Sequence, residues 1–267
     1  MRIALSQLTT GPDPEKNLRL VEEWTRRAAD AGARVVVFPE ASMACFGTPL
    51  APLAQPLDGP WADGVREIAL ATGTVVVAGM FTPADQGRVA NTLLATGPGA
   101  EEPVEESYDK IHLYDAFGFR ESETVAAGSR PAVIDVDGVR LGLATCYDVR
   151  FPELFRAHAD AGAVGTLLAA SWGAGPGKLD QWELLVRARA LDTTVWVAAV
   201  GQADPGTGPG PVPTGIGHSL MVGPDGTVRA SLGADPELLI TELDVEEVGA
   251  VREKTSVLAN RRPDVWR

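Results

Sequence analysis

The chain has 267 residues, of which 45% are hydrophobic and 22% are charged, and its formal net charge is −13. This is the composition of an ordinary globular protein, and it excludes a disordered chain and a coiled coil. No stretch approaches 18 uninterrupted apolar residues, so we expect no membrane span. The excess of negative charge argues against nucleic acid and anionic lipid as partners.

In the first half of the chain, apolar runs of strand length alternate with longer helical patterns. Val35-Val36-Val37-Phe38 is apolar at every position, which is typical of a strand buried on both faces of a sheet. Asp13-Pro14 supplies the cap and first turn of a helix that Gly32 ends. The predicted elements are, in chain order, a strand over 2–8, a helix over 13–31, a strand over 35–38, a helix over 61–72, and strands over 75–81, 89–96 and 104–109.

The same alternation of strand and helix patterns occurs in the second half, where Asp137-Gly138 predicts a tight hairpin. The elements predicted here are strands over 132–136 and 139–145, a helix over 151–161, a strand over 165–170, a helix over 179–192, and strands over 195–200, 217–222, 227–231 and 238–243. Because the order β-α-β-α-β-β occurs twice without a linker, we expect one α/β domain over 1–267 built of two similar halves. The Gly- and Pro-rich stretch 204–213 is interpreted as a surface loop, and 246–267 as a polar C-terminal tail.

Cysteine and histidine usage argues against a disulfide scaffold and a metal site. The two cysteines, Cys45 and Cys146, and the three histidines have no metal-ligand spacing. We therefore predict a reduced, cytoplasmic protein with no metal, and the N-terminus of the chain shows no secretory signal. The glycine-rich stretches 173–178 and 206–210 lack the residues of a phosphate loop and of a dinucleotide fingerprint, and no G-x-S-x-G elbow occurs.

Three chemically distinct side chains follow predicted strands. Glu40 comes after the strand 35–38, Lys110 after 104–109 and Cys146 after 139–145. Alone, each is also compatible with an ordinary role, as a buried structural cysteine or a solvated charge. Strand ends of an α/β sheet converge on one crevice, however, where a thiol, a carboxylate and an ammonium supply a nucleophile, a base and a cation for an oxyanion.

The segments around these residues resemble the signature segments of the nitrilase superfamily of carbon–nitrogen hydrolases. They are Phe38-Pro39-Glu40, Tyr108-Asp109-Lys110-Ile111-His112-Leu113 and Cys146-Tyr147-Asp148-Val149-Arg150-Phe151-Pro152-Glu153-Leu154, in the family's order. Residues 182–190 and 217–219 match further family segments, so the resemblance extends over about 2–244.

The resemblance implies a four-layer αββα sandwich and a Glu-Lys-Cys triad on Glu40, Lys110 and Cys146, with no cofactor. It also places a glutamate that helps to position the substrate at Glu121. Cys146-Tyr147-Asp148 resembles the amidase branch that includes omega-amidase and deaminated glutathione amidase, whereas nitrilases usually carry Cys-Trp-Glu. We therefore expect hydrolysis of a small non-peptide amide to a carboxylic acid and ammonia through a thioester.

We further expect the substrate to carry a carboxylate, for which a cation besides Lys110 is needed because the net charge of −13 repels anions. Arg150, Arg187 and Arg189 are the candidates for a carboxylate clamp. The residues expected to position the substrate are Glu121, Tyr147 with its backbone N–H at the oxyanion, Trp172 and Arg150. Without a carboxylate clamp, we expect an apolar pocket with Trp172 and Phe46 as its walls. Cys45 is interpreted as a small apolar residue beside the site.

The sequence is also compatible with two alternative functions, and it predicts an oligomeric state. The thioester could pass to an acceptor other than water, which would make the enzyme an acyltransferase, or the fold could serve as a non-catalytic binding module. We expect a homodimer or larger homo-oligomer, because Trp182, Leu185 and Trp266 exceed the apolar needs of one core.

Overall fold

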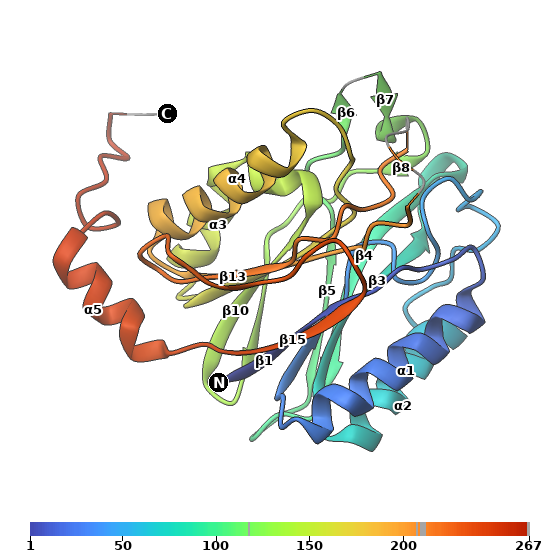
Figure 1. The fold of residues 1–267 in the computed structure, drawn as a ribbon, viewed down its shortest axis with the longest axis horizontal. Helices are drawn as coiled ribbons and strands as arrows, with labels where there is room; N and C mark the ends of the chain where they lie inside the picture. The colour runs from blue at the N-terminus through green and yellow to red at the C-terminus, as the bar shows by residue number, and fades with distance from the viewer. Residues whose placement is uncertain (117, 207, 209–211, 266–267) are drawn as a thin grey trace.

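Two β-sheets pack face to face, and helices cover the outer face of each (Figure 1). The computed structural model describes residues 1–116, 118–206, 208 and 212–265. The first sheet holds β1 (Arg2–Gln7), β2 (Val35–Val37), β3 (Val75–Pro83), β4 (Val89–Gly97), β5 (Val104–Asp109), β8 (Val125–Ala126) and β15 (Glu237–Glu242). The second holds β9 (Ala132–Val136), β10 (Val139–Thr145), β11 (Gly165–Ala170), β12 (Trp196–Gly201), β13 (Leu220–Val222) and β14 (Val228–Ser231).

The two sheets have the same internal arrangement. The first runs in the order β15-β1-β2-β3-β4-β5, and the second in the corresponding order β9-β10-β11-β12-β13-β14. Along these orders, the three central strands of each sheet are parallel and the outer ones antiparallel. Strand β8 lies off this path and pairs with β4 in parallel. The predicted pair of β-α-β-α-β-β halves is therefore confirmed.

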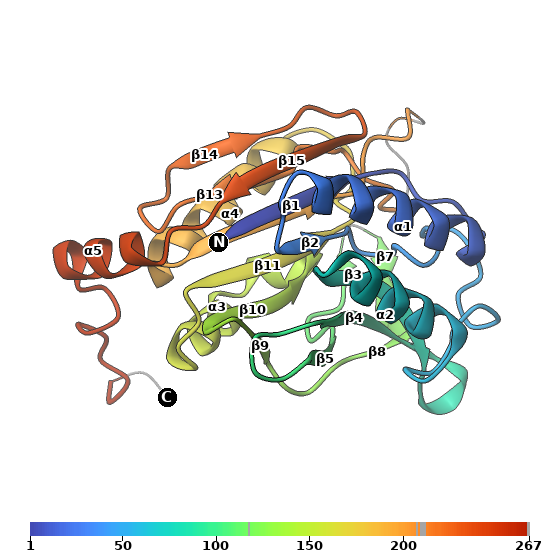
Figure 2. The ribbon, with the colours of Figure 1, turned by 90° about the horizontal axis from the view of Figure 1, so that it is seen from below.

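Helices form the two outer layers of the predicted αββα sandwich. Helices α1 (Pro14–Asp30) and α2 (Pro60–Thr72) lie on the first sheet, and α3 (Pro152–Asp160) and α4 (Lys178–Thr193) lie on the second (Figures 1 and 2). Asp13 caps α1 by accepting from the backbone N–H groups of Glu15 and Lys16, at 3.1 and 3.2 Å. The short hairpin β6 (Asp115–Ala116) and β7 (Phe119–Arg120) stands apart from both sheets.

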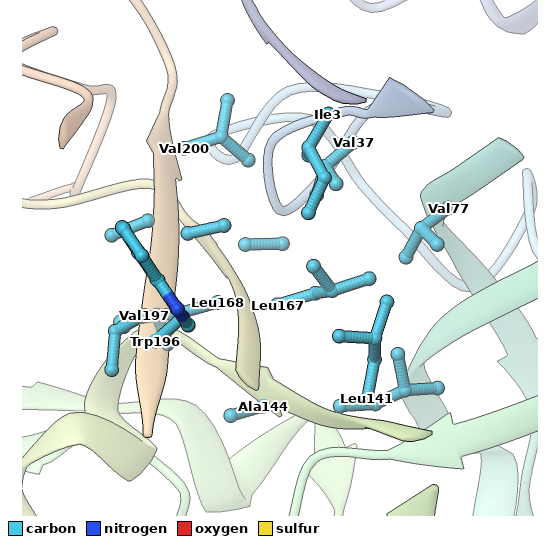
Figure 3. Packing of buried hydrophobic residues seen from close by; sticks show 14 of the residues in the cluster. Ile3, Val37, Val77, Leu141, Ala144, Leu167, Leu168, Trp196, Val197 and Val200 are labelled. Atoms are coloured by element: carbon cyan, nitrogen blue, oxygen red, sulfur yellow. The ribbon is translucent and has the colours of Figure 1, made fainter. Parts of the chain in front are cut away.

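The main core fills the space between the sheets. Ile3, Val37 and Val77 of the first sheet face Leu141 and Leu167 of the second (Figure 3). The pleat turns alternate residues the other way, so Val36 joins the separate cluster under α1 and α2. Strand β2, which is apolar at every position, is thus buried on both faces, as its uninterrupted apolar run predicts.

Turn chemistry decides several boundaries. Asp137 and Gly138, with φ of 55° and 82°, make the predicted tight hairpin between β9 and β10. Strand β13 begins at Leu220 rather than at 217, because Gly217 and His218 adopt positive φ of 71° and 54° and break the extended backbone.

The C-terminal region differs from the polar tail that the sequence suggested. Its first part is helix α5 (Val245–Thr255), which Asp244 caps and which buries Val248 and Val251. These two valines, three residues apart, are a short apolar stripe that is easily missed in a charged segment. Trp266 lies outside the described residues, as does part of the 204–213 loop. Among the described residues no helix is long and apolar enough to cross a membrane.

The structure also corrects the expectation for Trp182. Its side chain is completely buried within the chain, and its indole N–H donates to the carbonyl of His218 at 2.9 Å. Helix α4 instead exposes Leu184 and Leu191, which are 66% and 51% accessible. The helical pattern alone did not show which apolar residues of α4 face the sheet.

Candidate active site

The three predicted residues meet in one pocket at the carboxyl ends of their strands. Lys110 directly follows β5, Cys146 directly follows β10, and Glu40 lies three residues beyond β2. Their side chains are almost completely buried, as is that of Glu121 in the short helical turn Glu121–Glu123. All four line a pocket with an empty volume of about 390 Å³.

Lys110 lies between two carboxylates. Its Nζ is 2.9 Å from Oε1 of Glu40, and it is 3.1 and 2.9 Å from Oε1 and Oε2 of Glu121. The second oxygen of Glu40, Oε2, accepts from the backbone N–H of Ser171 at 2.9 Å. The ammonium and Glu40 are therefore held in place from both sheets.

Asn91, on β4, completes this cluster and was missed by the sequence analysis. Its side-chain Nδ2 donates to Oε1 of Glu40 at 2.8 Å and to Oε1 of Glu121 at 3.2 Å. Its backbone carbonyl accepts from the N–H of Lys110 at 2.9 Å. The signal in the sequence is an asparagine within a largely apolar strand that also contains threonines. This pattern is common, so it does not identify a site by itself.

Cys146 occupies a strained backbone position. It is the first residue of the turn Cys146–Arg150 and has φ of 46°, which is unusual for a residue other than glycine. Its Sγ lies 3.7 Å from the carbonyl oxygen of Ser171. The turn presents the thiol to the pocket at a sharp bend between strand and helix.

Asp148 holds this turn against the segment that carries Lys110. The carboxylate, which is fully buried, accepts from the backbone N–H of Thr145 at 2.9 Å and from the hydroxyl of Tyr108 at 2.6 Å. It also accepts from the backbone N–H of His112 at 3.1 Å and lies 2.7 Å from the ring Nδ1. The Asp148 side chain thus links the two family-like segments over 108–113 and 146–154.

The buried charges shift one another's pKa values. Burial raises the pKa of Glu40, a shift that Lys110 opposes and Glu121 increases. Burial and then the Glu40 carboxylate raise the pKa of the Cys146 thiol, which Lys110 partly offsets. Burial alone would lower the pKa of Lys110, but the two carboxylates outweigh it and hold that pKa well above its usual range. The thiol is therefore protonated beside a carboxylate of raised basicity.

Aromatic and cationic side chains form the rest of the pocket. Arg150 lies with its guanidinium carbon 5.8 Å from the ring centre of Tyr147 and 5.3 Å from that of Trp172. Its Nη2 donates to Oε1 of Gln181 at 2.7 Å. The pocket lining outside the charged cluster consists of Phe46, Tyr114, Phe119, Tyr147, Arg150, Ser171, Trp172, Gly173, Lys178 and Pro213.

Two of the three clamp candidates were wrong. Arg187 donates from Nε to the carbonyl of Gly226 at 3.0 Å, and Arg189 pairs with Asp192 at 3.3 Å. Only the start of α4 reaches the pocket, and Arg187 lies nine residues beyond Lys178, which is about 13 Å along the helix. Lys178 is a pocket cation that the sequence analysis did not find.

Among the residues that the structure describes, no group of three or more His, Cys, Asp and Glu side chains could hold a metal ion.

The chain belongs to the carbon–nitrogen hydrolase family, which it matches over residues 2–253. It is an enzyme of the amidase type within the nitrilase superfamily. The resemblance inferred from the three segments is confirmed.

Three relatives show the range of similarity. A protein of Mycobacterium tuberculosis (strain CDC 1551 / Oshkosh) named only as a hydrolase is 55% identical, over 98% of this chain and 95% of its own. The deaminated glutathione amidase of Escherichia coli O157:H7 is 34% identical over 98% and 97% of the two chains. A solved structure of a mutant of the amidase from Nesterenkonia sp. AN1 has the acetamide moiety of fluoroacetamide added covalently at the active-site cysteine. It is 27% identical, has a TM-score of 0.82 and covers 100% of this chain and 97% of that one.

Proposed function

We propose that this chain is a cysteine-dependent amidase that hydrolyses a small amide bearing a carboxylate to an acid and ammonia. The observation that carries the proposal is the buried cluster in which Glu40, Lys110 and the Cys146 thiol share one pocket. A catalytically inactive homologue or a binding module does not need a nucleophile, a base and a cation in the same buried pocket.

In the first half-reaction, Sγ of Cys146 attacks the amide carbon as Glu40 accepts the thiol proton. The carbonyl oxygen becomes an oxyanion that the Lys110 ammonium and the backbone N–H of Tyr147 stabilise. One such donor is worth roughly 3–4 kcal/mol in the transition state. The C–N bond then breaks, Glu40 returns the proton to the nitrogen, and ammonia leaves behind a thioester.

In the second half-reaction, water attacks the thioester carbon while Glu40 accepts one of its protons. The C–S bond breaks, the proton goes to Sγ, and the carboxylic acid is released. The same base serves both halves, which agrees with the raised pKa of Glu40 and with its contact to Lys110. The relative from Nesterenkonia sp. AN1 supports the nucleophile, because its active-site cysteine is the residue that carries the covalent addition.

The substrate class is inferred from the enclosure and charge of the pocket. Because the side chains of the charged cluster are almost completely buried, the pocket suits a small molecule rather than a folded peptide chain. Arg150 faces this space and bonds to the uncharged amide of Gln181. We propose that its guanidinium binds the substrate's carboxylate, and that amides rather than nitriles are cleaved.

The test is ammonia release from a panel of small acid amides by the wild type and by Cys146→Ala. Cys45→Ala is the matched control, because this second cysteine contacts Thr48 outside the pocket lining. We expect Cys146→Ala to lose all measurable hydrolysis while remaining folded, and Cys45→Ala to keep the wild-type rate. Full activity in Cys146→Ala would refute the mechanism.

Adding hydroxylamine to the same assay separates hydrolysis from acyl transfer. If water is the natural acceptor, acid forms in the absence of any other nucleophile, and hydroxamate appears only when hydroxylamine is present. A wild type that releases ammonia only with an added acceptor would be an acyltransferase instead.

A further inference from the structure

A second cation lies on the same wall of the pocket as Arg150. Lys178, the first residue of α4, lines the pocket with Arg150 and Cys146. Its Nζ is 3.4 Å from the hydroxyl oxygen of Tyr114 and 5.7 Å from the centre of that ring. Nothing in the three resembling segments points to this residue, which enters the pocket from a different part of the chain.

The backbone around Lys178 is held firmly. Its N–H donates to the carbonyl of Gly175 at 3.1 Å, and its own carbonyl accepts from the indole N–H of Trp172 at 2.9 Å. Gly177, with φ of 68°, makes the turn into the helix. The backbone of Lys178 is thus hydrogen-bonded to Trp172, a pocket residue that the sequence analysis predicted.

Lys178 and Arg150 are attached to the same turn of α4. Arg150 reaches Gln181, which lies three residues after Lys178 and so nearly above it on the helix. Burial lowers the pKa of Lys178, and the positive charge of Arg150 lowers it further. Two cations that repel each other in a partly buried pocket form a site in which a bound anion relieves the repulsion.

Within the described residues, no carboxylate forms an ion pair with Arg150, whose Nη2 donates to the uncharged side chain of Gln181. The positive charge of this guanidinium, which lines the pocket, is therefore available to a bound anion. Where a guanidinium and an ammonium line one pocket, one carboxylate oxygen can accept from the guanidinium and the other from the ammonium.

Tyr114 sets the distance between these cations and the reacting centre. Its backbone N–H donates to Oε2 of Glu121 at 2.6 Å, at the charged cluster, and its hydroxyl lies at Lys178. The length of one tyrosine side chain therefore separates the two ends of the pocket. A substrate that fits has its amide and its carboxylate at opposite ends of a short carbon chain.

We propose that Lys178 is the second half of the carboxylate clamp and determines the preference for acid amides. It binds one oxygen of the substrate's distal carboxylate while Arg150 binds the other. The inference rests on the proposed function and adds a residue and a length requirement to it. The competing interpretation is that Lys178 only packs on Tyr114 and supports the pocket wall.

The experiment compares the monoamide of a five-carbon dicarboxylic acid with its methyl ester, which lacks the charge. For each, kcat/KM is measured in the wild type, Lys178→Met and Lys178→Arg. The control is Lys16→Met, at an exposed lysine of α1 that pairs with Asp13. The matched arginine comparison is Arg150→Met beside Arg187→Met, since Arg187 lies outside the pocket lining.

We expect Lys178→Met to lower the acid-to-ester ratio of kcat/KM by about ten- to hundredfold, mainly through KM. Lys178→Arg, which keeps the charge, should retain the preference, and Lys16→Met should match the wild type. An unchanged ratio in Lys178→Met, or an equal loss on both substrates, would overturn the proposal. A wild type without a preference for the acid amide would overturn it as well.

Binding of the product provides a readout that does not depend on turnover. Calorimetry with the five-carbon dicarboxylate should give a Kd about ten- to hundredfold weaker in Lys178→Met than in the wild type. If the wild type hydrolyses no amide but binds the diacid through Lys178, the proposed function fails and the clamp stands. If amides are hydrolysed and the diacid binds equally to both proteins, the clamp fails and the proposed function stands.

Discussion

Lys110 shares its buried position with two carboxylates, so the ionised cluster has one negative charge in excess. Removing one partner of a buried ion pair typically costs 3–5 kcal/mol, because the other charge is left uncompensated. A free thiolate on Cys146 would add another negative charge to the same space. Burial, and after it the Glu40 carboxylate, therefore raise the pKa of the thiol, and the proposed mechanism moves its proton only as the C–S bond forms.

Asn91 is the neutral member of that cluster, and its substitution should change how Glu40 titrates. Its Nδ2 donates to both carboxylates and stabilises the charged form of Glu40. In Asn91→Ala the pKa of Glu40 should rise further, so the acidic limb of the pH profile of kcat/KM should move to higher pH. We expect kcat/KM at neutral pH to fall at least about tenfold.

The control for Asn91→Ala is Thr96→Val on the same strand, since the Thr96 hydroxyl bonds to Glu105 away from the pocket. Thr96→Val should keep the wild-type profile. A profile of unchanged shape in Asn91→Ala would mean that Asn91 does not influence the titration of Glu40.

Among the elements, strand β3 supports the segment that carries Glu40. A Cβ on Gly79 would lie 2.9 Å from the backbone nitrogen of Ala41 and 3.1 Å from the carbonyl of Pro39. These are backbone atoms, which cannot move aside as the end of a flexible side chain can. The absence of a side chain at Gly79 of β3 therefore determines where the carboxylate of Glu40 lies.

We expect Gly79→Ala to displace this segment and to lower kcat/KM at least about tenfold, because small displacements of catalytic groups are costly. The free energy of unfolding should fall by about 1–3 kcal/mol. Gly233→Ala is the control, since a Cβ there meets no atom within 4 Å. Wild-type kinetics in Gly79→Ala would show that the loop tolerates the contact.

Helix α3 and strand β10 enclose a histidine that should make stability depend on pH. His158 is fully buried, a Cβ on Gly142 would meet its ring, and burial lowers its pKa to about 4. The folded state holds the ring neutral, while the unfolded chain takes up a proton near pH 6.5. The free energy of unfolding should therefore fall by up to about 3 kcal/mol as the pH decreases from about 6.5 to about 4.

This dependence is measured by denaturant unfolding at several pH values in the wild type and in His158→Gln. The variant is expected to be less stable at neutral pH and to lose less stability than the wild type on acidification. Other groups titrate in both proteins, so their contribution cancels in the comparison. Parallel curves would assign the acid sensitivity to another group.

At the scale of the whole molecule, the site depends on contacts between the sheets. Glu40 follows β2 of the first sheet, yet its Oε2 accepts from Ser171, which follows β11 of the second and is 131 residues away. Its backbone carbonyl accepts from the side chain of Gln202, just after β12, at 3.0 Å. The packing of the two sheets therefore places the base, and the site forms only when the sandwich is complete.

The exposed face of α4 bears on the predicted homodimer. With Trp182 buried, Leu184 and Leu191 are the apolar residues that this helix presents outward. We expect a sedimentation mass of at least two chains at micromolar concentration, and a shift toward the monomer in the double variant Leu184→Asp/Leu191→Asp.

The control is Leu70→Asp, which changes a residue of similar exposure, 68%, on α2 on the opposite outer layer. This variant should keep the wild-type mass. A wild type that sediments at 28.1 kDa would show that the chain is a monomer.

Patterns in the chain predict the order of the main strands and helices and the two similar halves, and, together with the family resemblance, the three residues that meet in the pocket. They do not predict β6, β7, β8 or α5. The predictive patterns are local properties: strand and helix periods, turn residues such as Asp137-Gly138, and side chains that directly follow strands. The doubly buried strand β2 could be predicted because an uninterrupted apolar run needs a cover on both faces.

The packing of the folded chain determines which side of each element faces which neighbour. It excluded Arg187 and Arg189 from the pocket, buried Trp182, and brought in Asn91 and Lys178. The rotation of α4 about its axis and the placement of its first turn depend on packing against the second sheet. An amphipathic period gives the spacing of contacts along a helix, but contacts between residues far apart in the chain determine what those residues meet.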